Sequence, residues 1–434
     1  MKKNAWLIPF ALVCSLFFLW GLANSLNGSL VKQFQTALDL SRAQAGIVDT
    51  AFYLGYFVFA LPAGYFMRRF GYKRAILFGL LLYAAGAFLF YPAAGVRQFG
   101  IFLLALFTIA SGLAFLETAA NLYATVLGDR EGAAWRVNFA QIFNGMSIII
   151  GPLIGSLLIF SSAENFTREQ LVAMPHDQAE SIRIAQALAV RTPYMLIGLL
   201  VGAVALLFWL TPMPERVHAD TVPDVGTDRA SLRDLLGRPR LMTGVLAQAL
   251  NVGAQATLWS YFVDLKELFS PDVHVTAVEW LYPFEGKSAR QIAGFHASFA
   301  MILFLLGRLV GSLLMRRIRA ASVLVLFSAG AVVLALLAWY LGGGVAAVAA
   351  VMGIYFCQSI MFPTIFALAT EGLSAKEGKL ASGLVIMAIV GGAILPPLAG
   401  WLSHAEFRHM LLVPALCFVF VAYYGRSGAR QSAL

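Results

Sequence analysis

The sequence predicts an all-α polytopic membrane protein whose twelve transmembrane helices form two six-helix bundles. Three observations predict this class: an apolar composition, twelve apolar runs of spanning length, and similar segments in both halves of the chain. Of the 434 residues, 60% are hydrophobic and 12% are charged, and the mean hydropathy is +0.78. A soluble protein of this length would need far more polar surface, so the composition indicates a membrane protein.

The apolar runs extend from one end of the chain to the other. A helix of about 20 apolar residues crosses the roughly 30 Å hydrocarbon core of a bilayer. Such helices are expected at about residues 6–29, 43–67, 75–94, 99–127, 137–160, 192–212, 241–263, 292–315, 320–341, 344–369, 380–403 and 409–424. The first run follows Lys2 and Lys3 without an Ala-x-Ala-like cleavage site, so we expect it to stay as a helix and not to be a signal peptide.

Basic residues lie mainly in the short loops between these runs. With the N-terminus in the cytoplasm, the cytoplasmic loops hold about twice as many Lys and Arg residues as the opposite loops. Both termini are therefore expected in the cytoplasm. The net charge of +9 reflects these orientation signals, and no nucleic-acid partner is expected.

The cysteines predict no metal or disulfide chemistry. Cys14, Cys357 and Cys417 fall inside apolar runs and show no metal-type spacing. We expect them to be small buried residues, with no metal site and no cofactor. An enzyme is also disfavoured, because no nucleophile and base pair or metal cluster occurs at usable spacing.

The halves of the chain resemble each other and are joined by a polar segment. Residues 213–240 are rich in Pro, Gly, Asp and Arg and are expected to be a cytoplasmic linker between bundles at 1–212 and 241–434. GPLIGSLL in the fifth run matches PPLAGWLS in the eleventh, and MRRFGYKR after the second run matches MRRIR after the eighth. Two parallel six-helix repeats are the arrangement of the major facilitator transporters, whose substrate site lies between the halves near the bilayer midplane.

A glutamate interrupts the fourth apolar run. Glu117 is the only charged side chain in residues 101–127, near the middle of the expected helix. A carboxylate there costs about 2.5–3.5 kcal/mol on insertion, so it is expected to serve as a proton or substrate site, the alternative being a structural hydrogen bond between helices. Asp49, about two turns into the second run, is either a second cavity group or a residue near the outer mouth.

Two other charged or titratable residues within the runs are given structural interpretations. Arg308 lies near the cytoplasmic end of its run and is expected to snorkel or to pair structurally. His296 is expected to be a satisfied polar residue and not a proton relay.

Amides and aromatics recur at helical spacing in three of the runs. The candidate substrate-binding residues are Asn24, Asn27, Gln141, Asn144, Gln248, Asn251, Gln255, Trp259 and Tyr261. Each amide could instead join helices to one another, for about 1 kcal/mol. Several such stripes together favour a hydrated cavity that suits a sugar, because hydroxyls bond to amides and the apolar face of the ring stacks on an aromatic side chain.

Several segments together identify a family resemblance. LETAANLYATVLG, NFAQIFNG, VGAQATLWSY and FPTIFALA, with others across nearly the whole chain, resemble the fucose:proton symporters of the major facilitator superfamily. The resemblance implies import of L-fucose or a related hexose with a proton, by alternating access, in a bacterial inner membrane. It also implies that Glu117 carries the coupled proton and that Gln141 and Asn144 contact sugar hydroxyls. We expect a monomer.

One departure from the family pattern keeps alternatives open. The first run reads LANSLNGSL, with Gly28 where the family carries an aspartate. Asp49 is a candidate replacement, although no spacing demands it. A facilitator or a sodium-coupled hexose carrier is therefore an alternative, and a sugar-sensing membrane receptor is a further one.

Overall fold

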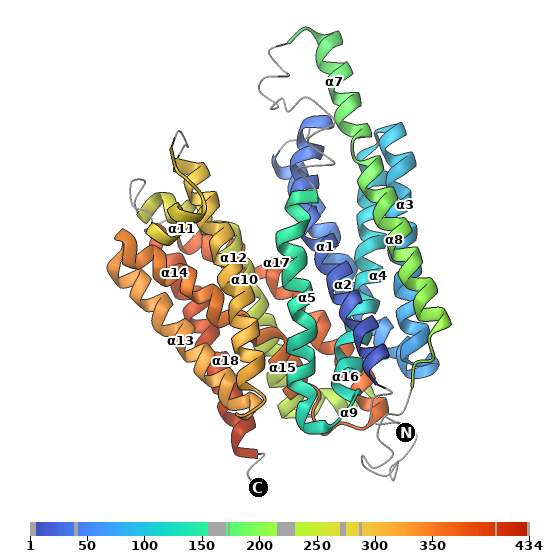
Figure 1. Cartoon of the computed structure of the whole chain (residues 1–434), viewed down its shortest axis with the longest axis vertical. Coiled ribbons are helices and arrows are strands. Elements are labelled where there is room, and N and C mark those ends of the chain that lie inside the picture. Colours follow the sequence, from blue (N-terminus) through green and yellow to red (C-terminus); the bar gives the residue numbers. More distant parts are fainter. Residues whose placement is uncertain are drawn as a thin grey trace. The chain divides into compact units, whose positions relative to one another are not determined.

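The computed structural model describes residues 6–38, 42–154, 171, 174–214, 231–269, 275–285, 289–403 and 406–431. Over these ranges the chain is helical and forms no strand (Figure 1). The helices are α1 (Leu7–Ala37), α2 (Arg42–Phe70), α3 (Tyr72–Val96), α4 (Phe99–Val126), η1 (Arg130–Gly132), α5 (Ala133–Ile154), α7 (His176–Leu188), α8 (Arg191–Leu210), α9 (Leu232–Leu236), α10 (Pro239–Phe269), α11 (Thr276–Leu281), α12 (Ala289–Leu314), α13 (Ala320–Leu341), α14 (Gly344–Gln358), α15 (Met361–Thr370), α16 (Ala375–Met387), η3 (Ala388–Val390), α17 (Gly391–Leu402), η4 (Phe407–Leu411) and α18 (Leu412–Gln431).

Each of the twelve predicted runs is helical over most of its described length. Within the described residues, nine helical segments are long and apolar enough to cross a membrane by length and composition alone. The other three predicted runs correspond to α2, α5 and α10. The tenth and eleventh runs are interrupted, since α14 gives way to α15 and α16 is joined to α17 through the 3₁₀ turn η3.

The chain divides into two compact units. The first comprises residues 1–123 and 143–219, and the second comprises residues 124–142 and 220–434. Most of the expected linker, residues 215–230, lies outside the described residues. The division into bundles at 1–212 and 241–434 joined by a linker stays a prediction.

In the first unit, α3 packs along α8 (Figure 1). The rings of Phe90 and Tyr194 stack across this contact with their centroids 3.9 Å apart. At the ends of the two helices, Lys73 Nζ donates hydrogen bonds to the carbonyls of Trp209 at 2.7 Å and Thr211 at 2.9 Å. A cation is favourable at a helix C-terminus, so Lys73, in the first turn of α3, stabilises the end of α8.

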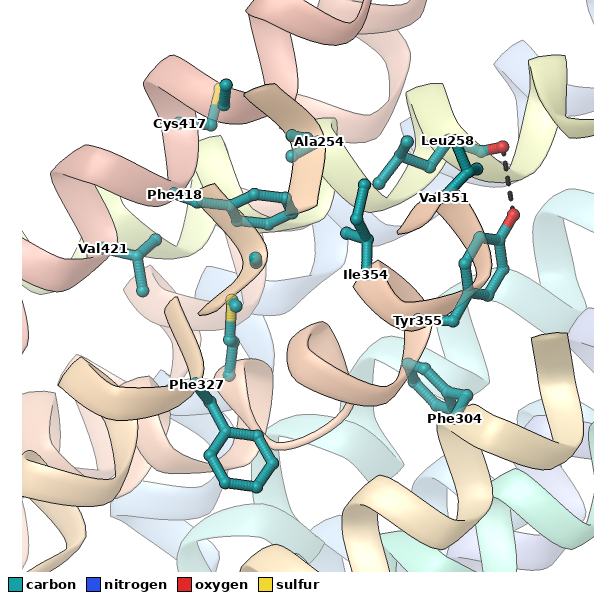
Figure 2. Packing of buried hydrophobic residues seen from close by; sticks show 14 of the residues in the cluster. Ala254, Leu258, Phe304, Phe327, Val351, Ile354, Tyr355, Cys417, Phe418 and Val421 are labelled. Atoms are coloured by element: carbon teal, nitrogen blue, oxygen red, sulfur yellow. Dashed lines mark hydrogen bonds between the residues drawn. The ribbon is translucent and has the colours of Figure 1, made fainter. Parts of the chain in front are cut away.

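The second unit has an extensive apolar core in which α13, α14, α18 and α10 meet. Figure 2 shows part of it, with Phe327 and Phe418 from α13 and α18 among the buried side chains. The same view shows the Tyr355 hydroxyl of α14 donating to the Leu258 carbonyl of α10 at 3.1 Å. Because both residues are buried, this bond fixes the lengthwise alignment of the two helices.

The interruption between α14 and α15 follows from the position of a proline. Pro363 has no backbone N–H, so the carbonyl of Ser359, four residues earlier, cannot receive its usual helical hydrogen bond. The helix ends at Gln358 and resumes at Met361, and Pro363 lies in the first turn of α15, where a missing N–H is tolerated. The junction therefore leaves a buried carbonyl that needs a donor from elsewhere.

The beginning of α5 belongs to the second unit. Asn138 Nδ2 donates to Thr364 Oγ1 at 3.1 Å, and the Arg316 guanidinium lies 4.5 Å from the ring centroid of Trp135. Buried Arg136 donates to the carbonyls of Ala124, Thr125 and Asp129 at 2.7–3.1 Å. The bonds to Ala124 and Thr125 satisfy carbonyls in the last turn of α4, and all three bonds connect the end of α4 to the start of α5.

Candidate functional site

Glu117 lies within α4 with only 6% of its surface exposed. Two polar neighbours come from other helices of the same unit. The Tyr56 hydroxyl of α2 lies close to both the Glu117 carboxyl group and the Asn24 amide of α1. Tyr56 is 2% exposed, and its hydroxyl has no hydrogen bond of good geometry to any described residue. A carboxyl, a phenol and an amide therefore meet, and Asn24 is exposed at the edge of this cluster.

α1 and α5 approach each other closely beside this cluster. A Cβ on Gly21 would overlap the side chains of Ser147 and Asn144, so glycine is needed at this crossing. Asn144 Nδ2 donates to the Phe17 carbonyl at 3.4 Å, and Ser25 Oγ donates to the Ser147 carbonyl at 3.1 Å. The predicted site residues Asn24, Glu117 and Asn144 thus belong to one compact unit.

Replacing Tyr56 by phenylalanine tests whether its hydroxyl serves transport. We expect sugar accumulation to fall about two- to tenfold, the equivalent of one hydrogen bond of about 0.5–1.5 kcal/mol that the hydroxyl makes during transport and not in this conformation. The Tm of the purified protein is expected to hold or rise, because a buried hydroxyl without a well-formed partner is removed.

The matched control for this prediction is Tyr83→Phe. Tyr83 is equally buried in the same unit, but its hydroxyl donates to the Leu19 carbonyl at 3.1 Å. The control is expected to lower the Tm and to leave the accumulation ratio unchanged. Equal accumulation by Tyr56→Phe and the wild type would show that the Tyr56 hydroxyl has no part in transport.

The α10 amides lie in the second unit, and they differ in how far their side chains are exposed to solvent. Gln248 and Asn251 are fully buried, with Gln248 Nε2 donating to the Phe362 carbonyl at 3.4 Å. Gln255 and Trp259 are partly exposed. Only the second half of the predicted stripe is therefore accessible in this conformation.

The aromatic candidates have defined neighbours. The Trp259 ring meets Phe304 edge to face, with the ring centroids 5.7 Å apart. The Tyr261 hydroxyl donates to the Pro396 carbonyl at 3.3 Å, which ties α10 to α17. This bond gives the Tyr261 hydroxyl a structural role. The Tyr261 ring is partly exposed. The role of both residues in substrate binding stays a prediction.

Sequence reasoning missed two polar residues. Tyr56 reads as one more aromatic residue in the apolar run FYLGYFVF. Gln358 is buried at the end of α14, and neither polar atom of its amide has a partner among the described residues. The sequence did contain a signal for Gln358: it is an amide five residues before Pro363, and a proline in an apolar run can mark a break in a membrane helix where polar groups are needed.

Gln141 and Arg308 are in direct contact. Both are buried, and the Arg308 guanidinium donates to the main-chain oxygen and to Oε1 of Gln141. Of the two expectations for Arg308, structural pairing is confirmed and snorkelling is wrong. His296 is also satisfied as expected, because its Nε2 accepts from the Val275 N–H at 3.1 Å and its Nδ1 lies 2.8 Å from the Ile292 carbonyl.

The side chains of Asn27 and Asp49 and the surroundings of Gly28 lie outside the described residues, although their helices are defined. Their predicted roles therefore rest on the sequence alone. No group of three or more His, Cys, Asp or Glu residues that could hold a metal ion occurs among the described residues.

Long apolar helices that bury a carboxyl group, a phenol and several amides define a polytopic membrane transporter. The chain matches the Major Facilitator Superfamily over residues 12–395. It is 38% identical to the L-fucose-proton symporter of Escherichia coli (strain K12), over 98% of this chain and 94% of the relative. It is 34% identical to a glucose/galactose transporter of Brucella abortus, over 96% and 93% of the two chains.

A solved structure agrees with these matches. The crystal structure of the transporter FucP in the outward conformation has a TM-score of 0.85 and 36% identity, and covers 98% of this chain and 99% of that one. The chain therefore belongs to the major facilitator superfamily and, within it, to the fucose:proton symporter family. The predicted fold class and family resemblance are both confirmed.

Proposed function

We propose that this chain imports L-fucose, or a closely related hexose, together with a proton by alternating access. The observation that carries the proposal is the buried Glu117 carboxyl group beside Tyr56 and Asn24, in a chain 38% identical to an L-fucose-proton symporter. A carboxyl group buried in a membrane helix is costly and is retained where it moves ions or binds substrate. Glu117 takes up the proton with the sugar and releases it on the other side.

The remaining site residues have sugar-binding roles in this proposal. Asn24, Asn27, Gln141 and Asn144 bond to hydroxyls, Gln255 also binds the sugar, and Trp259 is a stacking surface. Gln248, Asn251 and Tyr261 remain candidate substrate-binding residues, although Gln248 and Asn251 are buried in this conformation and the Tyr261 hydroxyl donates to the Pro396 carbonyl. From its place in the sequence, Asp49 is the candidate for a second coupling carboxyl group.

The protein acts as a monomer in the inner membrane of a bacterium, with both termini in the cytoplasm. No catalysis is proposed, because the family is one of transporters. A glucose or galactose carrier is the second candidate, favoured by the 34% identity to a glucose/galactose transporter. Gly28 favours a further alternative function, in which sugar transport is coupled to sodium in place of the proton, or to no ion.

Uptake into proteoliposomes separates these candidates. Labelled L-fucose, D-glucose and D-galactose are offered in turn under an inward proton gradient, an inward sodium gradient, or neither. We expect L-fucose to be concentrated above equilibrium only with the proton gradient, and the other two sugars to be taken up only weakly. Accumulation of glucose in preference to fucose, or accumulation driven by sodium, would replace the leading proposal with one of its alternatives.

A further inference from the structure

Arg308 is a charged residue within α12, and only 4% of its surface is exposed. A charge at such a position is costly unless hydrogen bonds satisfy it. Its guanidinium Nε donates to the Ser359 carbonyl at 2.9 Å, and its guanidinium carbon lies 4.6 Å from the ring centroid of Phe304. Its Nη1 donates to Gln141.

The sequence explains why Arg308 reaches the junction between α14 and α15. The Ser359 carbonyl is the group that Pro363 deprives of its helical donor. Gly307 packs against the Phe356 carbonyl and the Ser359 side chain, and Gly311 packs against Ile360. At both glycines a Cβ would overlap these atoms, so the GRLVG segment brings α12 close enough for Arg308 to bond there.

The contact with Gln141 fixes the orientation of an amide. Arginine has only donors, so the atom of Gln141 that faces the guanidinium must be the oxygen Oε1, at 3.2 Å. The same Nη1 also donates to the Gln141 main-chain oxygen, which anchors this turn of α5. The NH₂ group of Gln141 is then directed away from Arg308, as a donor.

We propose that Arg308 is a positioning residue for the substrate: it holds Gln141 so that the amide offers its NH₂ group, and not its oxygen, to a sugar oxygen. The inference rests on the proposed function, in which Gln141 binds the sugar. Because the guanidinium also bonds to the Ser359 carbonyl, the orientation of Gln141 depends on the geometry of the α14–α15 junction. Arg308 itself need not touch the sugar.

A double-mutant cycle on the full-length protein tests this inference. L-Fucose affinity and maximal exchange rate are measured for the wild type, Arg308→Lys, Gln141→Met and the double variant, with the Tm as a check on folding. Lysine keeps the charge and loses the planar fork, and methionine keeps the volume of glutamine. We expect Arg308→Lys to weaken affinity about tenfold and to change the exchange rate little.

The effect of Arg308→Lys in the Gln141→Met background decides the result. In that background we expect Arg308→Lys to lower L-fucose affinity less than twofold further, because Gln141, through which Arg308 acts, is already replaced. The proposal would be overturned if Arg308→Lys lowered L-fucose affinity equally in both backgrounds, or did not lower it in the wild-type background. A wild-type protein that binds neither L-fucose nor another hexose would instead overturn the proposed function, and the inference with it.

Gln141→Glu provides a second test that does not depend on the stability of an Arg308 variant. A carboxylate keeps the contact with the guanidinium as an ion pair but has no NH₂ group. We expect this variant to be at least as thermally stable as the wild type and to bind L-fucose about tenfold more weakly. Unchanged affinity would show that the Gln141 NH₂ group does not contact the sugar, and would overturn the proposal.

Discussion

Replacing Glu117 by glutamine is expected to abolish proton-driven accumulation of sugar while leaving exchange of sugar across the membrane intact. Glutamine has nearly the same shape and can hydrogen-bond to a sugar hydroxyl, so the site remains formed. It cannot take up and release a proton in the transport cycle. The internal sugar concentration should therefore rise to the external concentration and no further, as measured with labelled L-fucose in proteoliposomes under an inward proton gradient.

The matched control for Glu117→Gln is Glu180→Gln. Glu180 in α7 pairs with Arg97 at 2.5 Å and is partly exposed, so removing its charge should cost little stability and no coupling. Full accumulation by the Glu117 variant would show that its carboxyl group is not the coupling group. Loss of exchange as well as accumulation would assign Glu117 to sugar binding and leave the proton to another residue.

Replacing Gly391 by alanine is expected to destabilise the second unit strongly, although it adds only one methyl group. A Cβ at Gly391 would lie within 3.0 Å of the Ala249 main chain, on the helix α10 against which α17 packs. Backbone atoms cannot rotate away as a side chain can, so the two helices must separate. Overpacking of this kind costs about 1–3 kcal/mol or more, and we expect a clear fall in the Tm of the purified protein.

Gly202→Ala is the matched control, because a Cβ at Gly202 in α8 meets nothing within 4 Å. Alanine is the better helix former, by up to about 1 kcal/mol, so this variant should match or exceed the wild-type Tm. A Gly391→Ala protein as stable as Gly202→Ala would contradict the close approach of α10 and α17.

The positions of the helices could be predicted from the sequence because spanning length and apolar composition alone define them. The interruption at Ser359 could not be inferred in the same way, since α14 and α15 are both apolar and form one continuous run in the sequence. Pro363 was the only local indication of a break. A proline alone does not predict one in a membrane helix, because the outcome depends on which group donates a hydrogen bond to the freed carbonyl. In this chain the donor is Arg308, more than fifty residues earlier in the sequence.

The candidate site could be predicted in part. Glu117 and the amide stripes stood out because polar groups are costly within apolar runs. Helical spacing places Gln248 and Gln255 on one stripe, but it does not show that Gln248 is buried against Phe362 while Gln255 is partly exposed. Tyr56 was missed because tyrosine is common in membrane helices, and only the fold places its hydroxyl beside Glu117.

Proton movement caused by the sugar itself is the most direct test of the central claim. Proteoliposomes without any ion gradient are placed in a weakly buffered medium containing sodium, and external pH is recorded when L-fucose is added. Coupled import predicts that the medium becomes more alkaline as sugar enters, and that Glu117→Gln, which still exchanges sugar, gives no pH change. Entry of L-fucose into wild-type vesicles at constant external pH would contradict proton symport.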